Sequence, residues 1–426
     1  MLRSFLRGLV CFSVHPTDYE PLEATETGPV WPPVTLSSQM GPFVCLPPEL
    51  VQLIIGDVDP GMLATCSLVC SEWMLHARPR MFSRIAISLA NADRFGRLFE
   101  PPGRATFASS VREMELDHRI VGDFWTSDVL PKFVVQFPNL NTLCLFGLLP
   151  KSLPAAFEVI THLELNYICS PHPDRLASII SSFPRLEALK VTQEKGSYFN
   201  LETLSGVYRP PPHLRWVDLD NPVILHWIAS ADPKPRLESI RLEVSHPETA
   251  LAIDSIRALS PFIHTLDLAL SDLEVGAAFL AQTPLSTIPS LHTLRVQADH
   301  SQAAQILLKT LSSLDTALLS TVSLDFAIPY LDTPGPILTR LPWDALDAAL
   351  AALPALCRLT LVQVLVSPQG WRSRINQRSL FLDAVQSMPL CRRCCGFSTT
   401  VPRGAELDSE MRAPSRAAGS PRLCGY

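Results

Sequence analysis

One short pattern of aliphatic residues returns along most of this chain: an aliphatic residue, two variable residues, an aliphatic, one variable residue and an aliphatic. Its middle aliphatic moves from Met114 to Leu359 in nine steps, a distance of 245 residues and a period of about 27. A period of this length is typical of repeat architectures, in which each unit buries its apolar face against its neighbours. The copies are Val111/Met114/Leu116, Leu140/Leu143/Leu145, Ile160/Leu163/Leu165, Leu186/Leu189/Val191, Leu214/Val217/Leu219, Leu237/Ile240/Leu242, Ile263/Leu266/Leu268, Leu291/Leu294/Val296, Leu319/Val322/Leu324 and Leu356/Leu359/Leu361.

Each copy has the periodicity of a β-strand. The last two aliphatics flank one polar residue, as in Leu266-Asp267-Leu268, which places both apolar side chains on one face of a strand. Proline often stands just before the strand, as Pro184 does, where it ends a preceding helix. Helix-like segments lie between the copies, at 176–180, 253–259, 277–281, 303–308 and 346–353. This alternation predicts an α/β fold, with stacked parallel strands on one side and helices on the other.

The pattern resembles the leucine-rich repeat, whose units have about 20–29 residues. Two departures predict an irregular, degenerate solenoid. The Asn or Cys that this family carries three residues after the last strand aliphatic is replaced by Leu148, Ile168, Glu194 and Pro222. Spacing is also uneven, with 20 residues from Leu143 to Leu163 but 37 from Val322 to Leu359. The alternative is an ordinary α/β domain with Leu-rich parallel strands.

A second informative segment precedes the repeats. Pro47 and Pro48 suit a first helical turn, and Leu50, Leu53 and Ile54 then follow as an apolar stripe at i, i+3 and i+4. Asp59-Pro60-Gly61 predicts a turn, after which a second apolar cluster extends from Leu63 to Val69. These short helices carry more apolar surface than about 40 residues can bury alone. The excess must pack on the rest of the chain or on a partner.

This segment resembles the F-box, over roughly residues 44 to 85. The matching residues are Leu46, Pro47, Glu49, Leu50, Ile54, Leu63, Leu68, Val69, Cys70, Trp73, Arg78, Met81 and Phe82. The resemblance implies that the helices dock on the Skp-type adaptor of a cullin–RING (SCF-type) ubiquitin ligase and that the repeats bind a protein substrate, whose identity the sequence does not give. The resemblance implies a set of adaptor-binding residues that contact the adaptor or support that face: Leu46, Pro47, Leu50, Ile54, Leu63, Leu68, Val69 and Trp73.

Two other interpretations of the helical segment stay open. It can be an ordinary helical hairpin with a buried Trp. It can also be the cap of a non-catalytic leucine-rich-repeat scaffold, because solenoids need terminal caps over the core of the end repeat. Burial separates these interpretations: Leu50 and Ile54 are exposed in an adaptor site and buried in a cap.

Composition shifts divide the chain into four expected segments. We expect a disordered N-terminal segment at 1–43, the F-box at 44–88, the leucine-rich-repeat-like domain at 89–390 and a disordered tail at 391–426. The first segment is rich in Pro, Thr, Ser and acidic residues without periodicity, and the tail turns to Arg, Ser, Pro, Gly and Ala.

Charge and motifs argue against several function classes. The formal net charge of −6 does not indicate binding to nucleic acid or to an anionic membrane, which an excess of basic residues would favour. The sequence contains no run of 18 apolar residues, so we expect no membrane-spanning segment. We find no Gly-x-Ser-x-Gly, phosphate-binding Gly-rich loop or His-Glu-x-x-His motif, so we expect no enzyme activity and no cofactor. The cluster Cys391, Cys394 and Cys395 lacks a second ligand pair, so we expect no metal. Scattered cysteines indicate reduced thiols in a cytoplasmic or nuclear protein.

Charged residues recur in one slot of the repeat, between its last two aliphatics. They are Glu164, Lys190, Asp218, Arg241, Asp267 and Arg295. The leucine-rich-repeat resemblance implies that this slot faces the concave side of the sheet. Singly, each residue fits a solvated sheet face. Collectively, they predict a mixed-charge recognition surface for a folded protein or a degron.

Overall fold

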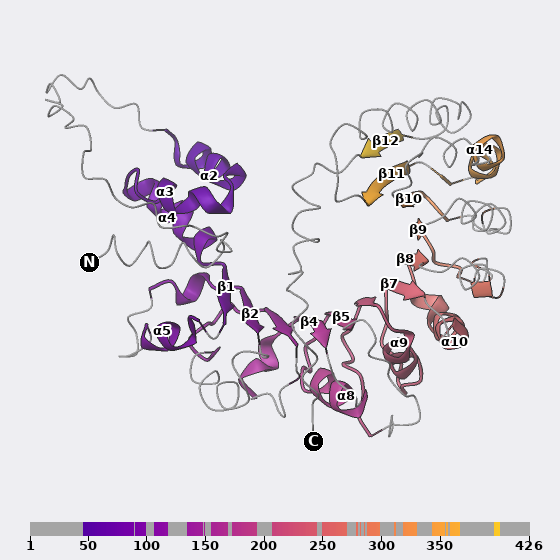
Figure 1. The fold of residues 1–426 in the computed structure, drawn as a ribbon, viewed down its shortest axis with the longest axis horizontal. Helices are drawn as coiled ribbons and strands as arrows, with labels where there is room; N and C mark the ends of the chain where they lie inside the picture. The colour runs from indigo at the N-terminus through magenta and orange to yellow at the C-terminus, as the bar shows by residue number, and fades with distance from the viewer. Residues whose placement is uncertain are drawn as a thin grey trace, which may run out of the picture. The chain divides into compact units, whose positions relative to one another are not determined.

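The computed structural model forms two compact units (Figure 1). Unit 1 comprises Met1–Phe146 and Pro150–Ile160, and unit 2 comprises Gly147–Leu149 and Thr161–Tyr426. The structure describes residues 46–88, 90–98, 106–117, 134–147, 149, 155–168, 173–193, 207–244, 249–270, 278–279, 282, 285, 288–298, 311, 318–329, 343–353, 355–356, 358–366 and 396–400.

Unit 1 begins with short helices that build their own small core. They are α2 (Pro48–Asp57), the 3-10 helix η1 (Pro60–Met62), α3 (Leu63–Cys66) and α4 (Ser71–Met81). Pro48 lies in the first turn of α2, where its missing N–H costs little. The Asp59 carboxylate accepts a hydrogen bond of 2.7 Å from the backbone N–H of Gly61 and fixes the turn. The core consists of Val51, Ile55, Leu63, Cys66 and Ala77, with Val58, Trp73 and Met81 packed against it.

Three parallel strands complete the regular structure described in unit 1. They are β1 (Arg84–Ile87), β2 (Glu113–Asp117) and β3 (Thr142–Phe146), accompanied by α5 (Ala92–Arg97) and the 3-10 helices η2 (Ala108–Ser110) and η4 (Ala155–Val159). Met114 of β2 lies opposite Ile85 on one side and Leu143 on the other. Phe82, directly after α4, stacks on Phe107 with ring centroids 4.9 Å apart. This contact ties the end of the helical segment to the loop before β2.

Unit 2 contains a sheet whose described strands follow one another in chain order. They are β4 (His162–Ile168), β5 (Ala188–Gln193), β6 (Trp216–Leu219), β7 (Ser239–Val244), β8 (Thr265–Leu270), β9 (Thr293–Ala298), β10 (Thr321–Pro329), β11 (Arg358–Val366) and β12 (Gly396–Thr400). Every neighbouring pair is parallel. The middle aliphatic of each repeat lies opposite that of the next, as Leu189 opposes Val217. The sequence repeat is therefore the structural repeat.

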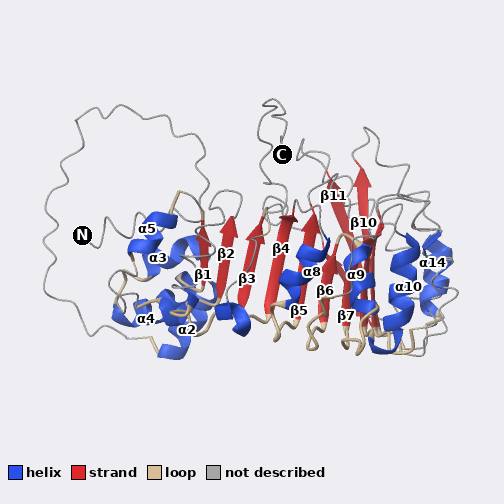
Figure 2. Ribbon diagram, turned by 90° about the horizontal axis from the view of Figure 1, so that it is seen from below, coloured by secondary structure: helices blue, strands red, loops and turns tan. Residues whose placement is uncertain are grey.

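Helices cover one face of the unit 2 sheet. They are α8 (Pro173–Ser181), α9 (Pro222–Ala229), α10 (Thr249–Leu259) and α14 (Trp343–Ala351), with the 3-10 helix η6 (Ser260–Phe262) after α10. Figures 1 and 2 show α8, α9, α10 and α14 on one side of the unit 2 strands. We call the opposite side, which carries the slot residue of each repeat, the inner face. This arrangement confirms the predicted α/β class and the helices expected near 176–180, 253–259 and 346–353; residues 303–308 lie outside the described residues.

Helix α9 was not expected from the sequence. Its residues from Pro222 to Ala229 are buried except for His226, so the helix has no polar stripe and shows no amphipathic period. The side chain of Asn221 starts it by accepting a hydrogen bond of 2.8 Å from the N–H of Val223. An Asn followed by Pro at the first helical position is the local signal that could have identified this helix.

The repeat aliphatics form the core on the helix-covered side of the strands. Leu189 and Leu266 have no exposed surface, and the remaining aliphatics of the pattern whose side chains the structure describes are also buried. Burying a Leu side chain contributes about 1.5–3 kcal/mol. The prediction that the aliphatics of each copy share one apolar face of the strand is confirmed.

Three expected boundaries differ from the elements and units of the structure. Strand β1 lies within the range 44–88 that was assigned to the F-box, because Phe82, Ile85 and Ile87 repeat the pattern with an aromatic first residue. The two units divide after β3 and not near residue 88. Strand β12 lies within the supposed disordered tail, where its backbone pairs with β11. The expected disorder of residues 1–43, 391–395 and 401–426 falls outside the described residues.

Candidate functional site

The helical segment of unit 1 exposes large apolar side chains on several of its elements. Of the predicted adaptor-binding residues, Leu46, Pro47, Leu50, Ile54, Leu68 and Val69 are exposed. Leu53, Met62 and Leu75 are exposed as well and were missing from the prediction. Exposed apolar patches larger than a few hundred Å² are uncommon on monomers and mark interaction sites. The segment therefore carries apolar surface beyond what its own core uses.

Two predicted site residues lie elsewhere. Leu63 belongs to the core of the helical segment, with only 2% of its surface exposed, so it supports the expected adaptor face from within. It starts α3, and its side chain turns inward to meet the α2 face that carries Val51 and Ile55. Trp73 is half-buried and packs against the same core. Both residues hold the helices together.

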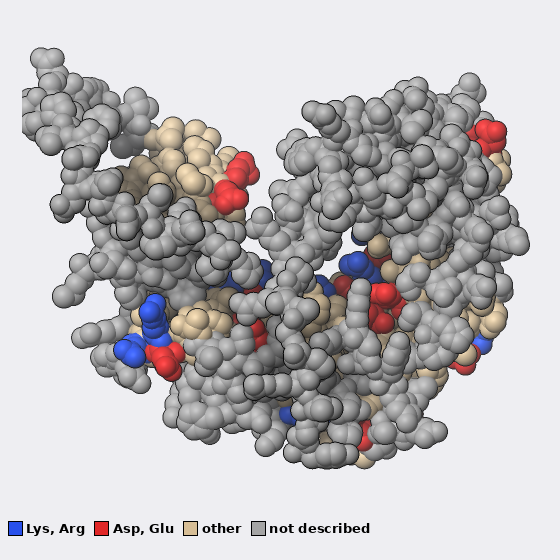
Figure 3. All heavy atoms as spheres, in the orientation of Figure 1, with Lys and Arg blue, Asp and Glu red and all other residues tan. Residues whose placement is uncertain are grey.

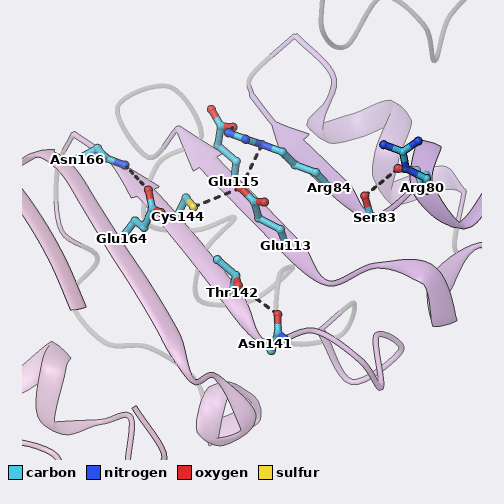
Figure 4. A network of polar contacts seen from close by, with 10 residues as sticks. All are labelled: Arg80, Ser83, Arg84, Glu113, Glu115, Asn141, Thr142, Cys144, Glu164 and Asn166. Carbon is cyan, nitrogen blue, oxygen red and sulfur yellow. Dashed lines mark hydrogen bonds and ion pairs between the residues drawn. The ribbon is translucent and has the colours of Figure 1, made fainter. Parts of the chain in front are cut away.

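Strands β1 and β2 carry an ion-pair network at the start of the sheet (Figure 4). The Arg84 guanidinium lies 3.1 Å from Glu113 Oε1 and 2.9 Å from Glu115 Oε2. Cys144 Sγ on β3 lies 3.7 Å from Glu113 Oε1, within the range of a weak hydrogen bond. Arg84 and its two carboxylates are partly exposed, so the network contributes modestly to stability.

The inner face of unit 2 carries an uninterrupted row of alternating charge. Glu164, Lys190, Asp218, Arg241, Asp267 and Arg295 lie opposite one another across β4 to β9. We call these six residues the charged row. Arg241 lies 3.6 Å from Asp218 and 3.7 Å from Asp267, and Arg295 lies 3.7 Å from Asp267. Figure 3 shows acidic and basic side chains gathered on the inner side of these strands.

The arginines of the charged row stand out from the surface and the aspartates are recessed. Arg241 and Arg295 are each 44% exposed, whereas Asp218 and Asp267 are 14% and 15% exposed. Burial raises the pKa of Asp218, the positive charges of Arg241 and Lys190 oppose this rise, and Glu164 adds to it. A molecule that approaches the inner face therefore meets the guanidinium groups before the carboxylates.

A cluster of polar side chains follows the charged row, at the carboxyl ends of β4, β5 and β6. Thr192 Oγ1 donates to Asn166 Oδ1 at 3.1 Å, and Asn221 Nδ2 donates to Gln193 Oε1 at 3.2 Å. The N–H of Gln193 donates to Asp220 Oδ2. These hydrogen bonds link neighbouring repeats beside the positions where the Asn or Cys of the leucine-rich repeat is missing.

Asp220 is the titratable group most perturbed in this cluster. Burial raises its pKa to about 6, and the negative charges of Glu243 and Asp218 add to the rise; the hydrogen bond from Gln193 opposes it. Asp220 Oδ1 and Gln193 Nε2 are buried and have no hydrogen-bond partner among the described residues. An ionised carboxylate in this setting destabilises the fold.

Metal-ligating clusters and membrane-spanning helices were sought among the described residues. Within them, no three His, Cys, Asp or Glu side chains come close enough together to hold a metal ion. No described helix has the length and apolar character needed to cross a membrane. The cluster Cys391, Cys394 and Cys395 lies outside the described residues.

Comparison with known proteins finds matches among solved structures only. No family model matches the chain, and no curated protein matches it. Among solved structures, the leucine-rich repeat-containing protein LegL7 from Legionella pneumophila is similar at 15% identity, with a TM-score of 0.33. The match covers 66% of this chain and 90% of that one.

Proposed function

We propose that this chain is a non-catalytic substrate receptor of a cullin–RING ubiquitin ligase. The helical segment from Leu46 to Met81 binds a Skp-type adaptor, and the repeat region binds a protein substrate. The observation that carries the proposal is the exposed apolar surface of the helical segment. Leu50, Ile54, Leu68 and Val69, which the F-box resemblance assigns to the adaptor, face solvent while the segment keeps a separate core.

The rival interpretation, a cap on the repeats, requires the opposite burial. A cap covers the core of the end repeat, so its apolar stripe must pack on the strands. Leu50 and Ile54 are 45% and 40% exposed, and α2 uses Val51 and Ile55 for packing within the helical segment. The observed burial favours a partner site over a cap.

Co-purification with a recombinant Skp-type adaptor tests the proposal on the full chain. Leu50→Asp places a charge in the apolar surface and should abolish co-purification while leaving the repeats folded. Val207→Asp is the matched control, because Val207 is an exposed aliphatic residue in unit 2, outside the helical segment. It should bind the adaptor as wild type does.

Three outcomes would contradict the proposal. The wild-type chain could fail to bind the adaptor, Leu50→Asp could bind at the wild-type level, or both variants could lose binding equally. A large loss of thermal stability in Leu50→Asp would instead support the cap, because the stripe would then be holding the fold together. Circular dichroism of each variant separates lost binding from lost folding.

A further inference from the structure

The two sides of the charged row differ chemically. Strand residues two positions before the row point to the same inner face, since side chains alternate along a strand. On β6 to β9 these positions hold Trp216, Ser239, Thr265 and Thr293, which oppose one another across the strands. All four are partly exposed, and each carries a hydrogen-bond donor on its side chain.

The positions two residues after the row are acidic on two adjacent strands. Asp220 follows β6, and the exposed Glu243 lies on β7. The row therefore separates a donor-rich side, toward the amino ends of the strands, from an acidic side. With Arg241 and Arg295 protruding above their recessed aspartates, the donor-rich side is suited to bind anionic groups.

The spacing of the cations limits the form of the anion. Lys190, Arg241 and Arg295 occupy the row on β5, β7 and β9, which are alternate strands. Neighbouring strands lie about 4.8 Å apart, so these positions repeat every ~10 Å. A polypeptide in the extended polyproline II conformation has three residues per turn and advances about 3.1 Å per residue, so every third side chain lies on one face and meets a cation about every 9 Å.

We propose that the inner face between β5 and β9 binds an extended acidic segment of a partner protein, with carboxylates at about every third residue. This proposal deepens the proposed function, on which it rests for the role of the repeat region in substrate binding. The segment crosses the strands on the donor-rich side of the row. Its carboxylates contact Lys190, Arg241 and Arg295, and Trp216 supplies an apolar surface, in keeping with the enrichment of Trp and Arg at binding hot spots.

A nucleic acid fits the same face less well. Polynucleotide binding relies on neutralising many phosphates with clustered Lys and Arg. Here each cation of the row alternates with a carboxylate, Asp220 and Glu243 lie beside it, and the chain has a net charge of −6. Discrete carboxylates held at fixed spacing match this surface better than a continuous polyanion.

Fluorescence anisotropy with the full chain and a labelled synthetic peptide tests the proposal. The probe carries three glutamates, each separated by two serines. There are three comparison probes. The first is a peptide of the same composition with its glutamates adjacent, and the second is the spaced peptide with lysines in place of glutamates. The third is a single-stranded oligothymidine. We expect the spaced acidic peptide to bind most tightly, and raising the salt concentration to weaken it.

Matched arginine variants locate the binding site. Arg241→Gln should weaken binding of the spaced peptide about 10-fold or more, because it removes a charged hydrogen-bond donor to a carboxylate. Arg257→Gln is the control: Arg257 is also exposed and lies 3.0 Å from an aspartate, Asp254, but on α10 on the opposite side of the sheet. It should bind the peptide as wild type does.

Several results would overturn the proposal: no binding of the spaced peptide, equal loss in both variants, or tighter binding of the lysine peptide or of the oligonucleotide. Adaptor co-purification of the same variants keeps the two proposals apart. If the wild-type chain binds the adaptor but not the spaced peptide, only the inner-face site is refuted. Peptide binding without adaptor binding refutes only the ligase role.

Discussion

Leu50 and Val51 are neighbours in α2, yet Val51 is completely buried and 45% of Leu50 is exposed. Both belong to apolar stripes on the same helix: Val51 continues to Ile55, and Leu50 continues to Leu53 and Ile54. One stripe builds the core of the helical segment and the other faces solvent. A helix with two apolar sides has one more than its own fold requires.

Aspartate at these two neighbouring positions should therefore have very different effects on folding. Val51→Asp buries a charge without a partner and should destabilise the helical segment by several kcal/mol. Leu50→Asp changes an exposed side chain and should shift the free energy of unfolding by only about 0.5 kcal/mol. Urea unfolding followed by circular dichroism measures both. Similar destabilisation by the two variants would mean that the Leu50 stripe is also packed.

Large-to-small changes in the repeat core should cost far more than changes on the sheet surface. Leu189→Ala and Leu266→Ala each remove a fully buried side chain and should cost about 2–5 kcal/mol. Arg257→Ala on the exposed side of α10 removes only a surface ion pair and serves as the control, with an expected effect below about 1 kcal/mol. Equal melting temperatures for the leucine variants and the control would contradict the assigned core.

Asp220 should make the stability of unit 2 depend on pH. Its pKa of about 6 in the fold lies above its ordinary value of 3.8, so the folded state holds the proton more tightly than the unfolded state. The contribution of this group is complete below its ordinary pKa and is lost as the pH rises through about 6. The loss is on the order of 3 kcal/mol at most.

Asp220→Asn removes this titration. The variant should gain stability relative to wild type between about pH 4 and pH 7.5, whatever its absolute stability, and urea unfolding at both pH values measures that difference. Asp254→Asn is the control, because it makes the same change of side chain at an exposed position on α10. A parallel pH profile for Asp220→Asn and wild type would show that Asp220 is not the group responsible.

Strand β12 should contribute to stability even though its sequence looks like part of a tail. Its pairing with β11 covers the backbone edge of that strand. Deleting residues 396–426 should therefore lower the melting temperature, by about 2–4 °C for each kcal/mol lost in a domain of this size. Deleting only 401–426 keeps β12 and should lower it less. Equal melting temperatures for the two truncations would exclude a stabilising role for β12.

The strands of the repeat region were predictable because their signal is local. Alternation of apolar and polar residues has the period of a strand. Ten copies of the pattern, about 27 residues apart on average, indicate strands that stack side by side in a parallel sheet. The pattern placed Leu189 and Leu266 in the core and Asp267 on the other face, and the structure agrees. The charged row followed from the same periodicity, since residues in equivalent positions of aligned repeats become neighbours across strands.

Two elements escaped sequence reasoning because their residues lack such a signal. Helix α9 is buried on nearly all sides, so hydrophobicity along it shows no period. Strand β12 contains Phe397, Ser398 and Thr399 in place of the alternating aliphatics, and it joins the sheet through backbone pairing, which any sequence except proline can provide.

The sequence by itself determined the period, the strand positions and the set of apolar residues in the helical segment, because each depends on residues close together in the chain. Only the tertiary structure decided which apolar side of α2 is buried, that Leu63 supports the helices from within, and that Arg241 protrudes while Asp218 and Asp267 are recessed. These features depend on which distant segments pack together, and burial is a property of that packing and not of the residues alone.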